Sequence, residues 1–347
     1  TNKSYFVKVN VHQLYGDTVV WKYYTHEQFD ASSVVDQRVS AIDNNLYWFA
    51  EQEGGSQQVR MGLLDGDIRQ WSDPVSVNGN VKLGSIITYN KSLYAVSKEG
   101  ELLMSQEGQN WNSVSTAFHF HNLLGVQPGV ELDGKRYSDE YMAAIVKHEE
   151  QYHFAYTFDG DTWTLAPIGG NGSTQLPEGF PIDGYTLPIS VNAQPKNGNI
   201  TSRLYVVGGV DQQGNLVNST WSCDGVSWVE FPQQNLPAMQ KASIVTYTRK
   251  ADKPGLLWIL HPGLMANGKV SRELWFSENS GVTWKKLSRE YSEMADTQNI
   301  APIACGSAFY SPKDFNIYFF GGIDEDGRQQ SSIYGGQYRL LNFSPIK

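Results

Sequence analysis

The sequence predicts an all-β fold, a six-bladed β-propeller built from four-stranded antiparallel blades. Three observations predict it: a turn phrase that recurs and ends in Trp, six short apolar runs, and a composition with 13% aromatic and only 18% charged residues in 347. The steps between the recurring Trp residues run from 40 residues (Trp71 to Trp111) to 65 residues (Trp163 to Trp228). Repeats of about 40–50 residues with variable insertions are typical of propeller blades.

The recurring phrase is a strand that ends in Ser or Thr, a short turn with Gly and an acidic or amide residue, and then a Trp. It occurs at Met104–Trp111, Tyr156–Trp163, Trp221–Trp228 and Phe276–Trp284, and more loosely at Leu64–Trp71. The acidic or Asn side chain can accept backbone N–H bonds in a tight turn, and Gly supplies the positive φ. The Trp can then pack on the neighbouring blade. We therefore assign a structural role to the repeat residues Trp71, Trp111, Asp159, Trp163, Asp224, Gly225, Trp228, Asn279, Gly281 and Trp284.

Six near-continuous apolar runs precede these phrases, as expected of strands that are buried on both faces. They are Leu46–Phe49, Leu93–Val96, Met142–Ile145, Leu204–Val207, Leu257–Leu260 and Ile317–Phe320. Each would be the second strand of a blade, after an inner strand of small residues. The blades then span about 34–76, 82–118, 120–167, 184–232, 240–288 and 301–343, within one domain over 1–347.

The last blade has no clear outer strand of its own, whereas the strand around Trp21 has no blade before it. We expect residues 1–24 to close the last blade, with Trp21 in the same sheet as Tyr318, because closure removes the exposed sheet edges.

The hairpin phrases resemble Asp boxes, the Ser-x-Asp-x-Gly-x-Thr-Trp turns of sialidase-type propellers. Ser277 to Trp284 matches except for Asn279 in place of Asp. The pairs Gly208-Gly209 and Gly321-Gly322 resemble the Gly pair of Kelch repeats. The combination is similar to uncharacterised Kelch-like propellers of Bacteroides-type bacterial surface proteins. This resemblance implies an extracytoplasmic location, in the periplasm or at the cell surface.

The resemblance does not extend to catalysis. A sialidase would require three converging arginines, a Tyr nucleophile with a Glu partner, and an Arg-Ile-Pro phrase, which is absent. A Kelch-type copper oxidase would require a Cys crosslinked to Tyr, and neither Cys223 nor Cys305 is placed for it. We therefore expect no catalytic residue, metal or cofactor, although His119 and His121, two residues apart, leave a metal pair open.

Bulk charge restricts the classes of partner. The net charge of -9 argues against nucleic acid, which requires a basic surface. No run of about 18 apolar residues could span a membrane. We expect a monomer.

The connections that lead into the inner strands share one end of a propeller, around the axial opening. Arg38, Lys82 and Lys241 occupy nearly equivalent positions there, and His119, Tyr185 and Gln240 lie in the same connections. Three cations at one opening would attract a carboxylate or sulfate in an otherwise acidic protein; alternatively, they are independent solvated side chains. The favoured function is a binding or scaffold module that recognises an acidic glycan or a protein. The alternative is a glycan-active enzyme, a hydrolase or lyase, with its site at this opening, and a role as a spacer also stays open.

Overall fold

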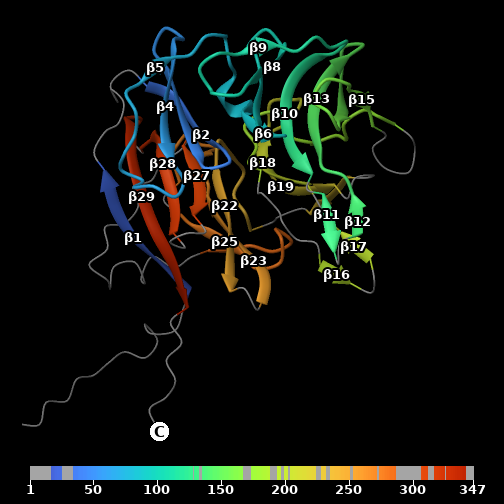
Figure 1. Cartoon of the computed structure of the whole chain (residues 1–347). Coiled ribbons are helices and arrows are strands. Elements are labelled where there is room, and N and C mark those ends of the chain that lie inside the picture. The colour runs from blue at the N-terminus through green and yellow to red at the C-terminus, as the bar shows by residue number, and fades with distance from the viewer. Residues whose placement is uncertain are drawn as a thin grey trace, which may run out of the picture.

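The computed structural model consists of β-strands, turns and loops, with a single 3-10 turn, η2 (Leu83–Ser85), among the elements that it describes (Figure 1). The described residues are 17–25, 34–127, 129–132, 135–166, 173–187, 194–196, 199–201, 204–223, 228–231, 235–250, 253–271, 273–286, 306–311, 316–324 and 326–340. Within them, no helix is long and apolar enough to cross a membrane.

Six antiparallel sheets form six blades, confirming the predicted fold class. Blade 1 contains β2 (Val34–Ile42), β3 (Asn45–Gln52), β4 (Gln57–Leu63) and β5 (Val75–Ser76), and blade 2 contains β6 (Ile87–Tyr89), β7 (Ser92–Val96), β8 (Leu102–Ser105) and β9 (Asn112–Ser113). Blade 3 contains β10 (His119–Gln127), β13 (Tyr141–His148), β14 (Gln151–Thr157) and β15 (Thr164–Leu165), and blade 4 contains β18 (Leu204–Val210), β19 (Leu216–Cys223) and β20 (Trp228–Phe231). Blade 5 contains β22 (Ser243–Lys250), β23 (Lys253–His261), β25 (Trp275–Ser277) and β26 (Lys285–Lys286), and blade 6 contains β27 (Ser307–Ser311), β28 (Asn316–Ile323), β29 (Gln329–Leu340) and β1 (Asp17–Thr25). Each of the six predicted apolar runs lies in the second strand of its blade.

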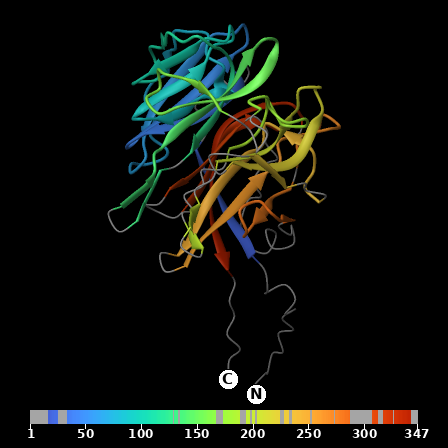
Figure 2. The same ribbon diagram turned by 90° about the vertical axis from the view of Figure 1, so that its right-hand side faces the viewer.

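The N-terminal strand closes the ring, as predicted. β1 pairs antiparallel with β29, with Trp21 opposite Gly336, and Tyr318 of β28 faces Gly335 in the same sheet. Figures 1 and 2 both show the blue β1 beside the red β29. The first and last strands of the described chain thus share one sheet, so β29 has no open edge there.

The inner position of blade 4 is less regular than that of the other blades. Its segment 182–187 pairs with β18 through two isolated bridges, Asp183 to Val210 and Thr186 to Val207. Two small hairpins extend the connections between the first and second strands of blades 3 and 4. They are β11 (Val130–Leu132) with β12 (Lys135–Ser138), and β16 (Gln194–Lys196) with β17 (Asn199–Thr201). β21 (Met239–Gln240), which leads into blade 5, pairs with β24 (Leu264–Met265), which lies in the connection between β23 and β25.

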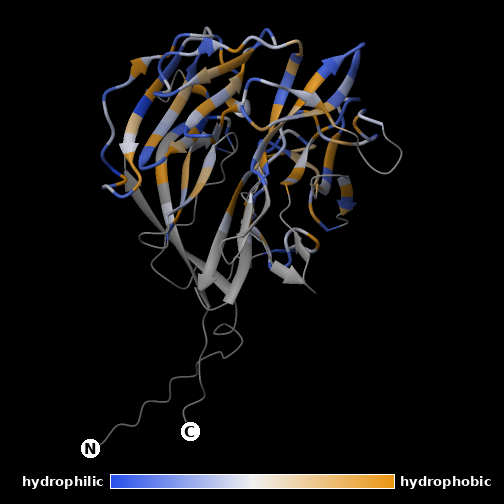
Figure 3. Ribbon diagram, turned by 45° about the vertical axis from the view of Figure 1, so that its right-hand side comes forward, coloured by the Kyte–Doolittle hydropathy of each residue, from blue (hydrophilic) through white to orange (hydrophobic). Residues whose placement is uncertain are grey.

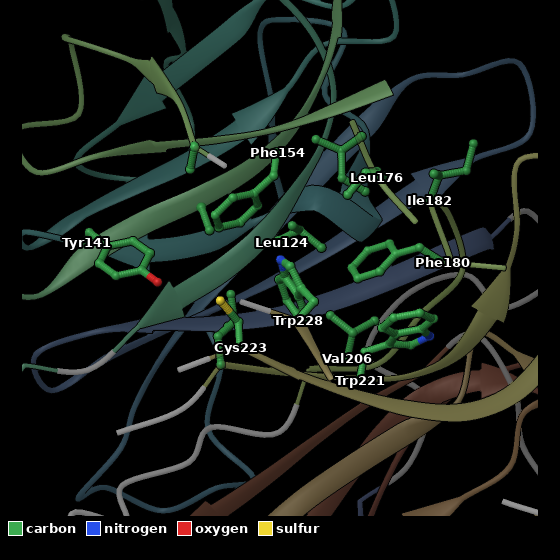
Figure 4. Close-up of a cluster of buried hydrophobic side chains, with 14 residues drawn as sticks. Leu124, Tyr141, Phe154, Leu176, Phe180, Ile182, Val206, Trp221, Cys223 and Trp228 are labelled. Atoms are coloured by element: carbon green, nitrogen blue, oxygen red, sulfur yellow. The ribbon is translucent and has the colours of Figure 1, made fainter. Parts of the chain in front are cut away.

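Apolar side chains fill the space between successive blades. The repeat residues Trp111, Trp163, Trp228 and Trp284 are at most 8% exposed, and each joins a cluster formed with the preceding blade. Figure 4 shows the cluster between blades 3 and 4, where Trp228 lies among Phe154 and Phe180 at ring-centroid distances of 5.7 and 4.9 Å. Figure 3 shows hydrophobic stretches in the strands and hydrophilic residues in many turns. Burial of these rings therefore holds the blades together.

The turn of the third blade shows how the Asp box is built. The Thr157 hydroxyl accepts the N–H groups of Asp159 and Gly160, at 3.3 and 2.9 Å. The Asp159 carboxylate accepts those of Asp161 and Thr162, at 2.9 and 2.7 Å. Asn279 does the same for the N–H of Thr283 in blade 5, at 2.9 Å. Asp224 and Gly225 lie outside the described residues.

The Gly pairs allow close approach between blades. Gly208 and Gly321 have φ values of +63° and +57°, and a Cβ at either would press on the next blade around the ring. At Gly321 it would lie 2.0 Å from the Gln37 side-chain oxygen. The second strands of blades 4 and 6 can therefore approach the following blade closely because both positions lack a side chain.

Candidate functional site

The candidate site is a cluster of polar side chains at the end of the axis where the inner strands begin. We call it the axial mouth and define it by Asp36 and Arg38 of blade 1, Lys82 of blade 2, His121 and Asn122 of blade 3, Asp183 and Tyr185 of blade 4, and Gln240 and Lys241 of blade 5. The Asp-box turns lie at the other end of the blades, because antiparallel strands reverse direction at each turn.

Asp183 is the centre of one half of the mouth. Its Oδ1 accepts a hydrogen bond from Lys82 Nζ at 2.7 Å, and its Oδ2 lies 2.8 Å from His121 Nε2. Asn122 Nδ2 is 3.4 Å from Oδ1. Lys82 also donates to the backbone oxygen of His121, at 3.1 Å. Lys82 belongs to blade 2 and Asp183 to blade 4, so this ion pair passes over blade 3.

The other half of the mouth contains Asp36, Arg38 and Lys241. Lys241 Nζ lies 3.9 Å from Asp36 Oδ2, an ion pair from blade 5 to blade 1 that passes over blade 6. Arg38 interacts electrostatically with Asp36 and with Tyr185 of blade 4, which stands opposite blade 1 in the ring. Its Nε–H is buried and has no hydrogen-bond partner. The charges therefore span the axis instead of lining separate strand ends.

Tyr185 is held by the neighbouring blade. Its hydroxyl donates to the backbone oxygen of Leu123 in β10. Burial, together with the charge of Asp183, holds the pKa of Tyr185 well above its usual value, while Arg38 opposes this shift. A tyrosine in this state is a poor nucleophile, because it keeps its proton and uses it in a hydrogen bond.

The two carboxylates of the mouth differ in their pKa shifts. Burial raises the pKa of Asp36, although Lys241, the backbone N–H of Gln37 and Arg38 favour its charged form. For Asp183, burial also acts to raise the pKa, but the hydrogen bonds from His121 and Lys82 outweigh it and the pKa is lowered. Asp183 is therefore a fixed anion, whereas Asp36 takes up a proton more readily.

The structure brings together five of the six residues predicted to bind a ligand, and their binding role stays a prediction. Arg38, Lys82, Tyr185 and Lys241 share the contacts above. Gln240 lies against blade 4, since a Cβ on Gly184 would be 3.0 Å from its Cβ. His119 lies at the rim, with its ring over Gly100 of blade 2 and no described contact to the cluster. The neighbouring His121 enters the mouth because the strand register shifts between Phe120 and Asn122, and a β-bulge re-aims side chains.

Sequence reasoning missed both carboxylates. Asp36 precedes Arg38 by two positions in β2, which places both on the same strand face. Asp183 precedes Tyr185 by the same spacing, in a segment that is not a regular strand. This alternation was the available signal. Among the described residues, no group of three or more His, Cys, Asp or Glu side chains is arranged to hold a metal ion. Cys223 is buried in the cluster between blades 3 and 4, and Cys305 lies outside the described residues.

Comparisons with solved structures identify the fold. The chain is similar to the NanB sialidase of Streptococcus pneumoniae in complex with 2-[(3-chlorobenzyl)ammonio]ethanesulfonate, with a TM-score of 0.51 and 9% identity over 92% of this chain and 70% of that one. It is also similar to the α-L-arabinofuranosidase Arb93A of Fusarium graminearum in complex with an iminosugar inhibitor, with a TM-score of 0.47 and 10% identity over 92% and 97% of the chains. A third is YCF48 in complex with a peptide, with a TM-score of 0.44, 10% identity, and 95% and 97% coverage. Only the first of these TM-scores exceeds 0.5, and at 9% identity that likeness shows a shared fold and nothing more.

Comparison by sequence assigns the family. No functionally curated protein matches the chain. A family model matches residues 15–346, which include every described strand and the whole axial mouth. The chain therefore belongs to the family of the DUF6242 β-propeller domain.

Proposed function

We propose that this propeller is a non-catalytic binding module whose ligand, a glycan or a segment of a protein, occupies the axial mouth. The observation that supports this most directly is the convergence of polar side chains from five blades on one end of the axis. Several remain open to solvent: the Lys241 side chain is 43% exposed and that of Asp183 is 38% exposed. Binding sites in proteins combine such convergent polar groups with a rigid frame.

The local chemistry suits binding better than proton transfer. Asp183 is engaged by Lys82 and His121, and the Tyr185 hydroxyl is engaged by a backbone oxygen. Groups that are already hydrogen-bonded in a fixed geometry can hold a ligand without first being reorganised. The extracytoplasmic location and the monomeric state stay predictions from the sequence.

The test is a binding screen followed by calorimetry on matched variants. The wild type is screened against a glycan array and a peptide library, and each hit is titrated with Lys82→Met/Lys241→Met and with Lys285→Met. Lys285 is the control, because its side chain is 66% exposed and pairs with Glu278 beside the Asp box of blade 5. The ligand should lose at least tenfold in affinity for the double variant and keep its affinity for the control. Equal affinity for all three proteins would remove the mouth as the binding site.

One observation favours the alternative, a glycan-active enzyme. The mouth holds two carboxylates whose pKa values shift in opposite directions, and such pairs supply the acid and the base of glycoside hydrolysis. In that case Asp36 would be the acid and Asp183 the base. The discriminating experiment is an assay with chromogenic glycosides: turnover by the wild type that Asp36→Asn abolishes would establish an enzyme.

A further inference from the structure

Arg38 differs from the other two cations of the mouth in having no partner for a buried donor. Lys82 donates to Asp183 and to a backbone oxygen, and Lys241 is paired with Asp36. Arg38 Nε–H is buried and makes no hydrogen bond. Among the described residues, no ion pair within 4 Å joins its guanidinium to a carboxylate. Of the three cations that were expected to attract an anion together, we therefore expect Arg38 to be the one that binds it.

A buried charged donor without an acceptor is costly for the folded protein. Leaving such a group unsatisfied costs about 1–3 kcal/mol, and more when it is charged. The neighbouring Gln37 does not supply the acceptor that Arg38 lacks, because its side chain faces the other way. Gln37 is hydrogen-bonded to Trp48 and to Gln330 in the interface between blades 1 and 6. Departures from local rules of this kind are found at functional sites.

We propose that Arg38 is the receptor for a carboxylate of the ligand, and that the ligand is a saccharide containing a uronic acid. This inference rests on the proposed binding function of the axial mouth. The two Nη groups of arginine lie side by side at the end of the guanidinium, so that end matches the two oxygens of a planar carboxylate. Lysine has no such fork.

The rest of the mouth fits the hydroxyl groups of a saccharide. Asp183 is an acceptor, Lys82 is a donor, and Gln240 is both. Sugar hydroxyls both donate and accept, so they can bind to each of these groups. The local charge is also suitable, because Lys241 is an electrostatic neighbour of Asp36 and reduces the repulsion between Asp36 and an incoming anion.

A purely structural role for Arg38 makes a different prediction. If Arg38 served only to balance the charge of Asp36, replacing it with Met would lower the melting temperature, since the half-buried Asp36 would lose a counter-charge. If Arg38 binds a ligand, Arg38→Met removes a charged group whose buried Nε–H has no acceptor, and the melting temperature stays the same or rises.

The experiment combines calorimetry, melting and NMR on the full chain. The probes are tetragalacturonate, its fully methyl-esterified form, and hexaglutamate. We expect the wild type to bind tetragalacturonate at least tenfold more tightly than the ester and the peptide. Arg38→Met should lower that affinity at least tenfold without a lower melting temperature, and Arg38→Lys should lie between. Arg69→Met, at the opposite end of blade 1, is the control. In spectra of the arginine Nε–H groups, the resonance missing from Arg38→Lys should shift saturably with sodium glucuronate and not with glucose or sodium chloride.

Three results would overturn the proposal, and they separate it from the proposed function. Equal binding of tetragalacturonate by wild type and Arg38→Met would refute the role of Arg38 while leaving a glycan-binding mouth intact. Tighter binding of hexaglutamate would refute the saccharide class in favour of an acidic protein. No saturable binding of any probe, with no shift of the Arg38 resonance, would remove the carboxylate receptor, and an empty glycan and peptide screen would remove the proposed function as well. If Arg38→Met fails to fold, Arg38→Lys takes its place, and an affinity for tetragalacturonate equal to that of the wild type would refute the role of Arg38.

Discussion

The glycine in the Asp box of blade 3 gives a direct test of how neighbouring blades lock together. Gly160 has a φ of +91°, and a Cβ there would lie 2.3 Å from the hydroxyl oxygen of Tyr94 and 2.9 Å from its Cζ. Tyr94 belongs to β7 of blade 2 and is 4% exposed, so its ring has no free space to enter. We expect Gly160→Ala to cost about 1–2 kcal/mol for the left-handed backbone and a further 1–3 kcal/mol for overpacking.

The control separates these two contributions. Gly214 has a similar φ of +84°, but no atom lies within 4 Å of the position of its Cβ. Gly214→Ala should therefore show only the backbone cost. The measurement is the urea midpoint followed by tryptophan fluorescence, converted with the measured slope. Tyr94→Phe, which removes the nearest atom, should recover part of the loss when combined with Gly160→Ala. Equal midpoints for Gly160→Ala and Gly214→Ala would show that the box does not press on the preceding blade.

Three further predictions concern stability. Burial lowers the pKa of His261 to about 4, so the unfolded chain binds more protons than the folded protein between about pH 4 and 6.5. The free energy of unfolding should therefore fall by about 3 kcal/mol as the pH drops through that window. His261→Gln should flatten this pH profile, which is measured by urea titration. Trp284 is 1% exposed, and Trp284→Ala should cost about 3–5 kcal/mol, whereas an unchanged urea midpoint would contradict its place in the core. Removal of the chain through Thr25 takes β1 from β29, and size-exclusion chromatography should show association through the exposed edge; a monomer with wild-type melting would refute the closure argument.

The fold could be predicted because its signals are local in the sequence. Within the third Asp box, Thr157, Asp159 and Trp163 lie within seven consecutive residues, and all their turn-forming hydrogen bonds stay inside that stretch. A short-range pattern of this kind survives in a single sequence, and five copies of it determine both the repeat and its period. Closure by β1 followed from counting strands, since one blade lacked an outer strand and one strand lacked a blade.

The arrangement of the axial mouth could be predicted only in part, because its contacts join distant positions. Lys82 and Asp183 are 101 residues apart, and His121 and Asp183 are 62 apart. The repeat predicts that Lys82 comes to the mouth, but not which side chain from another blade will neutralise it. The turn of His121 toward the axis depends on a bulge that has no sequence signature. Sequence alone therefore treated Lys82 as available to a ligand, whereas the structure shows it bound to Asp183.

Hydrogen bonds tie together the inner strands around Arg38, so a ligand would bind to strands that are already ordered. The inner strands are tied to one another around the axis: Val39 N–H donates to the Ser307 hydroxyl at 2.8 Å, and the Thr88 hydroxyl donates to the Ala41 oxygen at 2.6 Å. On the far side, the Thr186 hydroxyl donates to the Ala242 oxygen at 2.8 Å. These bonds connect blade 1 to blades 6 and 2, and blade 4 to blade 5. The strand that carries Arg38 is thus held in place before a ligand arrives, so no cost of ordering the backbone is left for the binding step. Because strand side chains and not loops would supply the proposed anion contact, substitutions at the mouth should change affinity with little effect on the fold.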